Sequence, residues 1–365
     1  MPKNPFKFGS VVDTPYFTDR REEMRRVKEI LASENHLIVS SPRRFGKSSL
    51  IFKAVQDLDR PVISLDLQLI TSTTDLASQL LRRIYRIYPF EKVRQYVLHF
   101  RVIPTLKINP VSNAVDVSFH QAISEQPLLE DVLNLLEQLS SDKKRLIVIF
   151  DEFQEAARIS PQLLQQMRAI MQHHKKLNYI FMGSQESLIR EIFEKKKSSF
   201  YHFGLVMPLG KIPKEDFETY LVHGFQQITN KSLRLAEQIL HFSDCHPYYT
   251  QQLAYMVWEK CRRNPDGTEL VAEAVQDLIR QHDMDYERIW YNCQKTDKKL
   301  LIGMALSGLT PLSQEFFNQY DIPAASTAYS SLKRLAVSGM LSKSGNRYEI
   351  DDPFFSLWLK QKREE

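Results

Sequence analysis

Residues 37–52, LIVSSPRRFGKSSLIF, constrain the fold more than any other stretch of the sequence. The apolar run at residues 37–39 is typical of a buried strand, and it ends in a loop of small and basic residues. An apolar-periodic segment that contains Leu50 and Ile51 follows this loop and indicates a helix. The succession of buried strand, glycine-containing loop and helix predicts an α/β protein.

The loop matches the pattern G-x-x-x-x-G-K-[ST], except that Ser41 stands in place of the first glycine. Gly46 allows the backbone to curl, so that successive N–H groups converge on phosphate oxygens at the positive end of the following helix. Lys47 supplies a cation for the outer phosphates of a nucleotide, and the Ser48 hydroxyl is suited to ligating Mg²⁺. The alternative, a Gly-Lys-Ser tripeptide in an ordinary turn, is disfavoured by the strand before it and the helix after it.

A second motif lies at residues 145–155, RLIVIFDEFQE, where a continuous apolar run ends in Asp151 and Glu152. Adjacent acids at the carboxyl end of a buried parallel strand face the ligand crevice of an open α/β sheet. Asp151 would hold the magnesium ion through its water shell, and Glu152 would orient and polarise the attacking water. Solvated acids at a strand end are the alternative, and the presence of Lys47 and Ser48 argues against it.

A further strand is predicted within residues 177–188, LNYIFMGSQESL, and its polar end would lie beside Asp151. Ser184 or Gln185 could sense the terminal phosphate there, although a simple strand-to-helix cap explains them nearly as well. A strand around residues 204–207 would complete the sheet. Other predicted elements are a strand at 61–67 and helices at 17–34, 74–88 and 128–139, the first of these capped by Asp19 or Thr18.

Composition places the chain among globular proteins of two or three domains, with 365 residues of which 43% are hydrophobic and 25% charged. Cys245, Cys261 and Cys293 lie too far apart for a disulfide framework or a zinc cluster, which fits a reducing cytoplasm. The N-terminal residues lack the apolar core of a signal peptide, and no apolar run is long enough to span a bilayer. We therefore expect a cytoplasmic protein without a membrane segment.

The most basic region lies between residues 80 and 110, where one glutamate, Glu91, accompanies seven lysines and arginines: residues 82, 83, 86, 92, 94, 101 and 107. Aromatic residues are interleaved with them, which suits contact with nucleic acid or with an acidic protein partner at 82–107. The aromatic spacing also suits a hydrophobic core. Segments 102–108 and 114–120 alternate in polarity and predict a β-hairpin, so about residues 80–120 form an insertion in the core domain.

The segments FTDRREEM, SPRRFGKSSL, LIVIFDEFQE, GSQESL and HPYYTQQLA, in this order, resemble the archaeal-type ATPases of the AAA+ superfamily, near the signal-transduction ATPases with numerous domains. The resemblance covers nearly the whole chain. It implies a P-loop NTPase core with a five-stranded parallel sheet at residues 1–210, an all-helical lid at 211–296 and a winged helix at 297–365. In that lid, Trp258, Trp290 and Tyr291 are expected to be core residues.

The resemblance also implies ATP and Mg²⁺ as ligands. The family's nucleotide contacts fall on Ser41, Pro42, Arg43, Arg44, Phe45, Gly46, Lys47, Ser48, Ser49, Asp151, Glu152 and Ser184. Phe17 and Arg20 match its F-x-x-R-x-x-E motif beside the base, and His246 and Pro247 match a lid motif that approaches the nucleotide. Read without the resemblance, His246 and Pro247 indicate only the start of a helix.

The chain departs from the family at two places. One is Ser41, and the other is the segment Tyr201-His202-Phe203, where many relatives carry a tyrosine followed closely by an arginine. That arginine can act as a finger toward a neighbouring active site. Its absence here argues against activation by a neighbouring subunit and points to slow hydrolysis without a partner. The sequence does not determine the oligomeric state.

The C-terminal segment has the pattern of three helices and a hairpin that turns at Gly345-Asn346, which is the outline of a winged helix. Its third helix offers Lys333 and Arg334 to DNA, but residues 297–365 hold nine basic and eight acidic residues, a weak electrostatic footprint. The apolar segment 352–360 is expected to pack back onto the chain.

These observations leave three hypotheses for the function. The first is a Mg-dependent ATPase that switches conformation in a regulatory or signalling role. The second is a DNA-binding regulator whose conformation is set by the nucleotide. The third is a nucleotide-gated protein-interaction scaffold with little turnover.

Overall fold

The computed structural model describes residues 2–11, 16–18, 20–108, 115–119, 125–265, 267–344 and 347–364. The chain divides into two compact units. We call the first the sheet unit, which comprises Arg21–Ser41 and Leu50–Leu209. The second, the lid–wing unit, comprises Met1–Arg20, Pro42–Ser49 and Gly210–Glu365.

The sheet unit is built on a five-stranded parallel sheet in the order β2-β5-β6-β1-β7. The strands are β1 Leu37–Ser40, β2 Val62–Asp66, β5 Leu146–Asp151, β6 Leu177–Gly183 and β7 Leu205–Pro208. Strands β1 and β6 are buried along their whole length, and β5 is buried up to Asp151, as continuous apolar runs predict for strands covered on both faces. The predicted five-stranded parallel sheet is confirmed.

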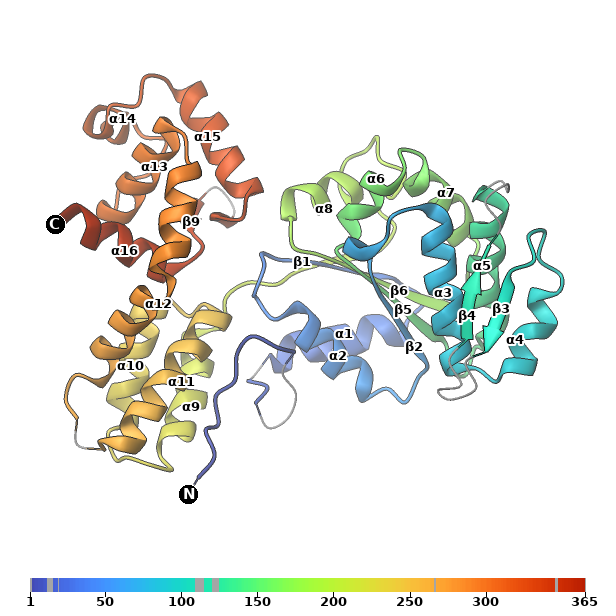
Figure 1. Cartoon of the computed structure of the whole chain (residues 1–365), viewed down its shortest axis with the longest axis horizontal. Helices are drawn as coiled ribbons and strands as arrows, with labels where there is room; N and C mark the ends of the chain where they lie inside the picture. The colour runs from blue at the N-terminus through green and yellow to red at the C-terminus, as the bar shows by residue number, and fades with distance from the viewer. Residues whose placement is uncertain are drawn as a thin grey trace. The chain divides into compact units, whose positions relative to one another are not determined.

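Helices cover both faces of this sheet, with α1 and α2 on one side and α6, α7 and α8 on the other (Figure 1). The helices associated with the sheet are α1 Arg21–Ala32, α2 Lys47–Gln56, α3 Thr73–Ile87, α4 Phe90–Val97, α5 Glu125–Leu139, α6 Ala156–Ile159, α7 Leu163–Met171 and α8 Glu186–Phe193, with short 3-10 helices η1 Leu67–Leu69 and η2 Phe153–Glu155. The first three residues of α2 count with the lid–wing unit.

Helix α1 begins at Arg21 and buries Val27, Ile30 and Leu31, which confirms that a helix lies within the predicted segment 17–34. Its expected cap differs. The Thr18 hydroxyl is buried and has no hydrogen-bond partner among the described residues, so the prediction that Thr18 caps the helix is wrong. The other expected cap, Asp19, lies outside the described residues.

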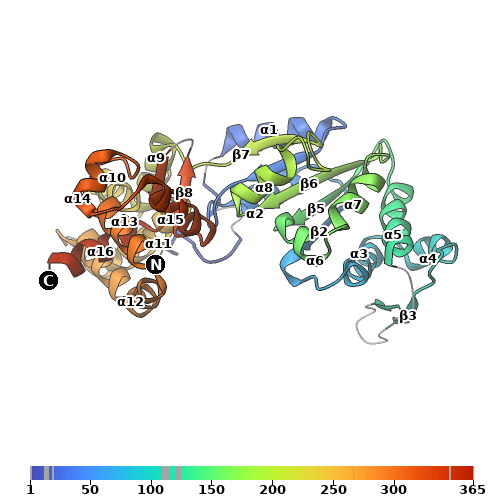
Figure 2. The ribbon, with the colours of Figure 1, turned by 90° about the horizontal axis from the view of Figure 1, so that it is seen from above.

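The basic region packs its aromatic residues into the core of the sheet unit. Tyr85 and Phe100 are buried, and Tyr88, Phe90 and Tyr96 are half-buried against the same core, so the core interpretation of these aromatics is confirmed. The predicted hairpin is also present, as antiparallel strands β3 Thr105–Ile108 and β4 Val115–Ser118 next to α3 and α4 (Figures 1 and 2). Residues 109–114 between them lie outside the described residues.

Several cations of the basic region already have partners inside the sheet unit. Arg82 forms an ion pair with Asp116, Arg83 donates to the Ser64 carbonyl at 2.7 Å, and Arg101 contacts Glu130 and Asp131 at 2.8 Å. A protein contact at residues 82–107 therefore stays a prediction that depends on the exposed Arg86, Lys92 and Lys107.

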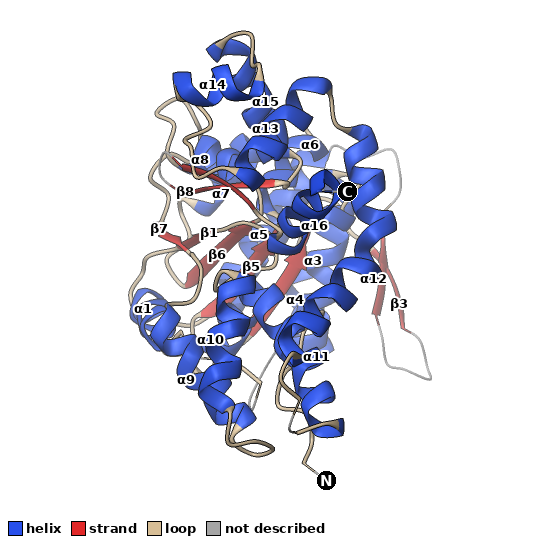
Figure 3. Ribbon diagram, turned by 90° about the vertical axis from the view of Figure 1, so that its left-hand side faces the viewer, coloured by secondary structure: helices blue, strands red, loops and turns tan. Residues whose placement is uncertain are grey.

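The lid part of the lid–wing unit is helical, with α9 Lys214–Phe225, α10 Ser232–Ser243, α11 Pro247–Arg263 and α12 Leu270–Asn292 (Figure 3). Trp258 is 1% exposed in its core, and Trp290 packs against that core. Tyr291 is 85% exposed, so the prediction that it is a core residue is wrong. The reason is its place on α12, where Tyr291 lies two turns from Met284, itself 84% exposed, on a face turned to solvent.

The carboxyl-terminal part has the winged-helix elements that the sequence predicts. They are α13 Lys295–Leu306, α14 Gln314–Tyr320, α15 Ala325–Val337, the antiparallel strands β8 Leu341–Ser344 and β9 Arg347–Ile350, and α16 Pro353–Glu364. The turn residues Gly345 and Asn346 lie outside the described residues. Helix α16 buries Phe354, Phe355 and Trp358, which confirms that this apolar segment packs back onto the chain.

Arg334, one of the two expected DNA contacts, is engaged inside the winged helix. Its guanidinium lies 2.6 Å from the carboxylate of Asp297, which is 3% exposed in the first turn of α13. Burial acts to raise the pKa of Asp297, but hydrogen bonds from Arg334 and Ser331 outweigh it and leave the pKa below its ordinary value. Loss of Arg334 would therefore disturb the fold of this domain as well as any DNA contact.

None of the helices in the described part of the chain is long and apolar enough to cross a lipid bilayer.

Candidate functional site

The loop between β1 and α2 has the geometry that phosphate binding requires. Helix α2 begins at Lys47 with no acidic residue in its first turn, and the amino terminus of a helix carries a partial positive charge. Gly46 adopts a φ of 86°, in the left-handed region, and the position of a side chain there would meet no atom within 4 Å. Lys47 is 7% exposed, and its Nζ donates to the Pro42 carbonyl at 3.2 Å, across the loop. A glycine in the left-handed region, a helix amino terminus and a cation are the features that a phosphate-binding loop uses.

Serines flank this glycine-lysine pair. Ser41 is fully buried where β1 ends, and its N–H lies 3.5 Å from the Gly183 carbonyl of β6. Ser48 is half-buried and Ser49 is buried, in the first turn of α2. The strand, loop and helix expected around these residues are thus present, and their contacts with a nucleotide stay predictions.

Helix α11 of the lid holds the loop from the side. Arg44, at a φ of 65°, donates to the Tyr249 hydroxyl at 2.9 Å, and its guanidinium lies 4.8 Å from the centre of the Tyr248 ring. Phe45 is 4% exposed, and its ring packs edge-on against His246 at 4.7 Å. Arg43 is exposed. Arg44 and Phe45 of the loop therefore both contact residues at the start of helix α11.

Arg20 also fixes the loop. It is 6% exposed, has a φ of 75°, and its Nη2 donates to the carbonyls of Phe45 at 3.2 Å and Gly210 at 2.8 Å. These bonds tie the loop to the start of the lid segment. Phe17 is half-buried. The nucleotide-base contacts that the resemblance implies for Phe17 and Arg20 stay predictions.

His246 caps α11, and Pro247 occupies the first position of that helix, so the helix start predicted there is confirmed. His246 Nδ1 accepts from the backbone N–H groups of Tyr248 at 3.2 Å and Tyr249 at 3.5 Å. Nε2 has no hydrogen-bond partner among the described residues and lies 3.9 Å from Asp351 Oδ2. Burial lowers the pKa of His246 to about 3, so the imidazole is neutral at physiological pH.

Asp351 faces this imidazole from the end of the winged-helix hairpin. Burial, assisted by the neighbouring charge of Asp352, raises the pKa of Asp351 to about 7, while Arg44 and Lys211 act in the opposite direction. Because His246 is neutral, the 3.9 Å approach is not an ion pair. Folding thus favours a proton on Asp351 and disfavours one on His246.

The two shifts give opposite pH dependences of stability. His246, with a lowered pKa, contributes stability that is complete above pH 6.5 and is lost as the pH falls toward 3. Asp351, with a raised pKa, contributes stability that is complete below pH 3.8 and is lost as the pH rises through 7. Between about pH 4 and 6.5, the stability gained from His246 as the pH rises should offset the stability lost from Asp351. We therefore expect the unfolding free energy of the native protein to change little over this range.

Single substitutions should reveal each slope. In His246→Asn, which keeps a capping side chain, unfolding free energy should fall with pH between about 4 and 7 relative to the native protein, by up to about 1.4 kcal/mol per pH unit. In Asp351→Asn it should rise over about pH 4 to 6.5. Urea unfolding followed by tryptophan fluorescence measures this, because all three tryptophans, Trp258, Trp290 and Trp358, lie in the lid–wing unit. If the unfolding free energy of both variants depends on pH as that of the native protein does, the pKa shifts of His246 and Asp351 are contradicted.

The carboxylates lie at the carboxyl end of β5 in the sheet unit. Asp151 is the last residue of β5 and pairs in register with Asp66, the last residue of β2. Glu152 follows with a φ of 49°, a left-handed conformation that costs free energy in a residue other than glycine. The buried Phe150 and Phe153 on either side hold the backbone there.

Hydrogen bonds from Ser184 and Gln154 hold the side chain of Glu152. Its Oε2 accepts from Ser184 Oγ at 2.7 Å, from Ser184 N at 3.2 Å and from Gln154 Nε2 at 2.5 Å. Ser184 follows β6, the strand that pairs with both β5 and β1, so the sheet brings Ser184 to Glu152, the residue after the predicted neighbour Asp151. Three donors on one oxygen fix the orientation of this carboxylate, which is what a general base requires. Phosphate sensing by Ser184 stays a prediction.

Gln154 is the residue of this site that sequence reasoning missed. It is 2% exposed in the turn η2, and its Oε1 has no hydrogen-bond partner among the described residues. A side chain at Gly183 would approach that oxygen to 2.5 Å, so the glycine is needed for this arrangement. The sequence did carry a signal: Gln154 lies two residues after Glu152, close enough for a turn to bring its side-chain amide back to that carboxylate.

Two family models match the chain. A model described as an ATPase domain predominantly from Archaea matches residues 17–253, and one described as a probable winged helix domain matches residues 284–361. No curated protein gives a significant match.

Solved structures share the fold over the whole chain. A Walker-type ATPase of Pyrococcus abyssi is 20% identical, with a TM-score of 0.68 over 98% of this chain and 99% of that chain. The ORC2 protein of Aeropyrum pernix, in complexes with ADPNP and ADP, is 14% identical, with a TM-score of 0.55 over 99% of this chain and 100% of that chain. The fold and the match to the first model agree with the loop and carboxylate motifs described above, and the chain belongs to the family of ATPase domains found predominantly in Archaea.

Proposed function

We propose that this protein binds ATP with Mg²⁺, hydrolyses it to ADP and phosphate, and uses the cycle as a conformational switch in a regulatory or signalling role. The observation that carries the proposal is the fixed carboxylate of Glu152, held by Ser184 and Gln154 at the sheet edge where β1 also ends in Ser41. The chain continues from Ser41 into the loop that carries Lys47.

The residues divide the chemistry as follows. Lys47 and the N–H groups of the loop hold the phosphates, and Ser48 and Asp151 hold the magnesium ion, which neutralises phosphate charge when bound. Glu152 orients a water molecule and accepts its proton while the water oxygen bonds to the terminal phosphorus. The bond from that phosphorus to the oxygen of ADP breaks, and ADP leaves with the electron pair.

The conformational part of the proposal is supported by the contacts of Arg44. Its partner Tyr249 also interacts with Asp352, which accepts from the Tyr286 hydroxyl at 3.0 Å. A bound nucleotide that competes for Arg44 would alter these contacts, which run from the loop through the lid to the winged helix. A ligand can shift a conformation only through such differential contacts.

The test is phosphate release by the purified protein with ATP and excess Mg²⁺, compared with the same reaction in EDTA. We expect steady ADP production that stops on metal removal, because the phosphate charge is then left uncompensated. GTP in place of ATP tests the choice of base. Absence of both nucleotide binding and phosphate release under all conditions would contradict the proposal.

A DNA-binding role for the winged helix is the second candidate. The observation that favours it is the outer face of α15, where Tyr329 is 53% exposed and Lys333 is exposed. Adding duplex DNA to the hydrolysis assay tests this role, with Lys333→Ala as the variant, because Arg334 already pairs with Asp297. Stimulation by DNA that is lost in the variant and weakens steeply with salt would support it.

A further inference from the structure

The amino-terminal segment of the chain packs against helices α9 and α11 of the lid (Figure 1). We call residues 4–8, Asn-Pro-Phe-Lys-Phe, the strap. At its centre, Phe6 is 2% exposed and packs against Phe225 of α9, with ring centres 5.0 Å apart. A side chain at Gly224 would approach the Phe6 ring to 2.5 Å, so this glycine makes room for the ring. The nucleotide chemistry described above makes no use of the strap.

Hydrogen bonds fix the strap along α11. Asn4 Nδ2 donates to the Tyr255 carbonyl and to Glu259 Oε1, both at 3.1 Å. The Lys7 N–H donates to Gln251 Oε1 at 3.4 Å. Because Gln251, Tyr255 and Glu259 are spaced four residues apart, they form one row along the helix. The strap therefore has a fixed position and direction on the lid.

The strap ends at the tyrosine that contacts Arg44 of the nucleotide loop. The rings of Phe8 and Tyr248 pack nearly perpendicular, with centres 6.0 Å apart, and Phe8 also packs against Tyr255 at 5.5 Å. The Arg44 guanidinium lies 4.8 Å from the centre of the Tyr248 ring. A ring packed on Tyr248 restricts its side-chain rotation and keeps it beside Arg44. Phe8 therefore stabilises the contact between Arg44 and the lid.

We propose that the strap is a latch on nucleotide binding, in which Phe8 is a positioning residue that holds Tyr248 against Arg44. A nucleotide whose phosphates attract Arg44 must compete with Tyr248, so the docked strap lowers ATP affinity. Linkage requires the reverse effect, in which bound ATP loosens the strap. The docking of the strap stands on its own contacts, whereas its effect on ATP affinity rests on the proposed function.

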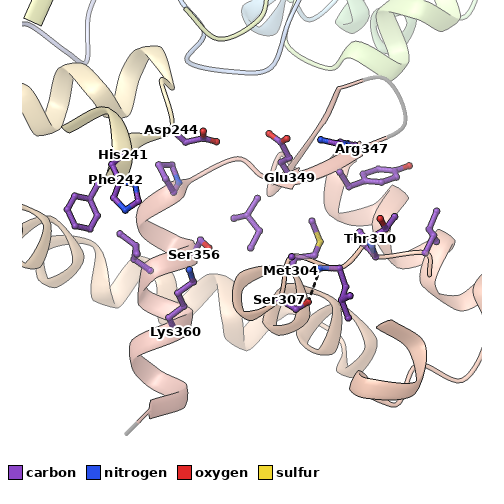
Figure 4. Close-up of a pocket in the computed structure, with 18 residues that line it drawn as sticks. His241, Phe242, Asp244, Met304, Ser307, Thr310, Arg347, Glu349, Ser356 and Lys360 are labelled. Atoms are coloured by element: carbon purple, nitrogen blue, oxygen red, sulfur yellow. Dashed lines mark hydrogen bonds between the residues drawn. The ribbon is translucent and has the colours of Figure 1, made fainter. Parts of the chain in front are cut away.

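Phe8→Ala in the full chain tests the latch by isothermal titration with ATP and Mg²⁺. We expect ATP affinity to rise about three- to tenfold, the factor that one aromatic pair can supply. Phe8→Tyr keeps a ring against Tyr248 and should bind ATP as the native protein does. The matched control, Phe242→Ala, removes another half-buried ring of the lid–wing unit, which lines a cavity beside α16 (Figure 4). It should also keep the native affinity.

A double variant shows whether Phe8 acts through Tyr248. In the Tyr248→Ala background, Phe8→Ala should leave ATP affinity unchanged, because the ring that Phe8 positions is gone. A general loss of packing at the strap would change ATP affinity equally with and without Tyr248. That equal change, or an unchanged or lower ATP affinity in Phe8→Ala alone, would overturn the latch.

Hydrogen exchange of the intact protein without nucleotide tests the docking separately, by mass spectrometry of the fragment that contains the strap. We expect its amides to be protected, and to exchange at least tenfold faster in Phe6→Ala, which loses the buried ring. Saturating ATP should speed exchange in the native protein about threefold or more. Unprotected amides in the native protein would overturn the docking.

Two further outcomes are distinguishable from these. If the native protein does not bind ATP, the proposed function is contradicted, while the protection of the strap is unaffected. If light scattering shows a dimer that Phe6→Ala dissociates, the strap of a second copy occupies this surface, and the latch within one chain is overturned.

Discussion

Replacing Glu152 by glutamine is expected to slow ATP hydrolysis by about 10²–10⁴-fold and to leave nucleotide affinity within a factor of about two. Glutamine fills the same space and can still accept from Ser184, so the turn after β5 should keep its conformation. It cannot accept the proton of the attacking water, because an amide oxygen is too weak a base. Phosphate release and binding of a fluorescent ATP analogue, measured on the same preparation, separate the two effects.

Two neighbouring variants make this test specific. Glu155→Gln removes a carboxylate three residues away that pairs with Arg158 at 2.9 Å, and it should hydrolyse ATP at the native rate. Gln154→Ala should give an intermediate loss of about tenfold, because Glu152 then keeps two of its three described hydrogen bonds. Native hydrolysis by Glu152→Gln would rule out this residue as the base.

Replacing Lys47 by alanine is expected to lower ATP affinity by about a hundredfold or more. A hydrogen bond between charged groups is worth up to about 3 kcal/mol, which corresponds to that factor. The amine is already positioned across the loop by the Pro42 carbonyl, so little ordering is needed when phosphate replaces that partner. Isothermal titration with ATP and Mg²⁺ measures the loss directly.

Lys53→Ala is the matched control for this variant. Lys53 lies on the same helix, and its Nζ is 3.9 Å from Asp57, so its removal changes the net charge equally without touching the loop. We expect native affinity from it. If Lys47→Ala binds ATP as the native protein does, while its tryptophan fluorescence shows a folded lid–wing unit, the assignment of the loop as the phosphate site fails.

Local sequence patterns predicted the strands that carry the site because burial on both faces leaves an unbroken apolar run. Strands β5 and β6 are such runs, and the polar residues that end them are the ones that meet in the structure. Strand pairing then accounts for the contact between Glu152 and Ser184, which are 32 residues apart. This much follows from the rule that parallel strands gather their carboxyl ends at one edge.

Contacts that depend on side-chain packing across distant segments could not be predicted in this way. Arg44 meets Tyr249, 205 residues further along the chain, through a hydrogen bond that no local pattern encodes. The pairing of His246 with Asp351 is equally remote in sequence, and so is the pairing of Arg334 with Asp297. The aromatic residues of the basic region suited two interpretations because core packing and base stacking use the same side chains.

The unbroken length of helix α12 determines how movement passes from the lid to the winged helix. It is one uninterrupted helix of 23 residues, about 35 Å long, that buries Leu270 and Leu278 among the lid helices and, nearer its other end, packs Tyr286 against Phe355 and Trp358 of α16. A continuous helix does not hinge in its middle, so α12 carries a tilt of its lid end to the end that packs against the winged helix. A tilt of about 10° at the lid end would move the far end by roughly 6 Å, so a small rearrangement of the lid becomes a displacement large enough for a binding partner to detect.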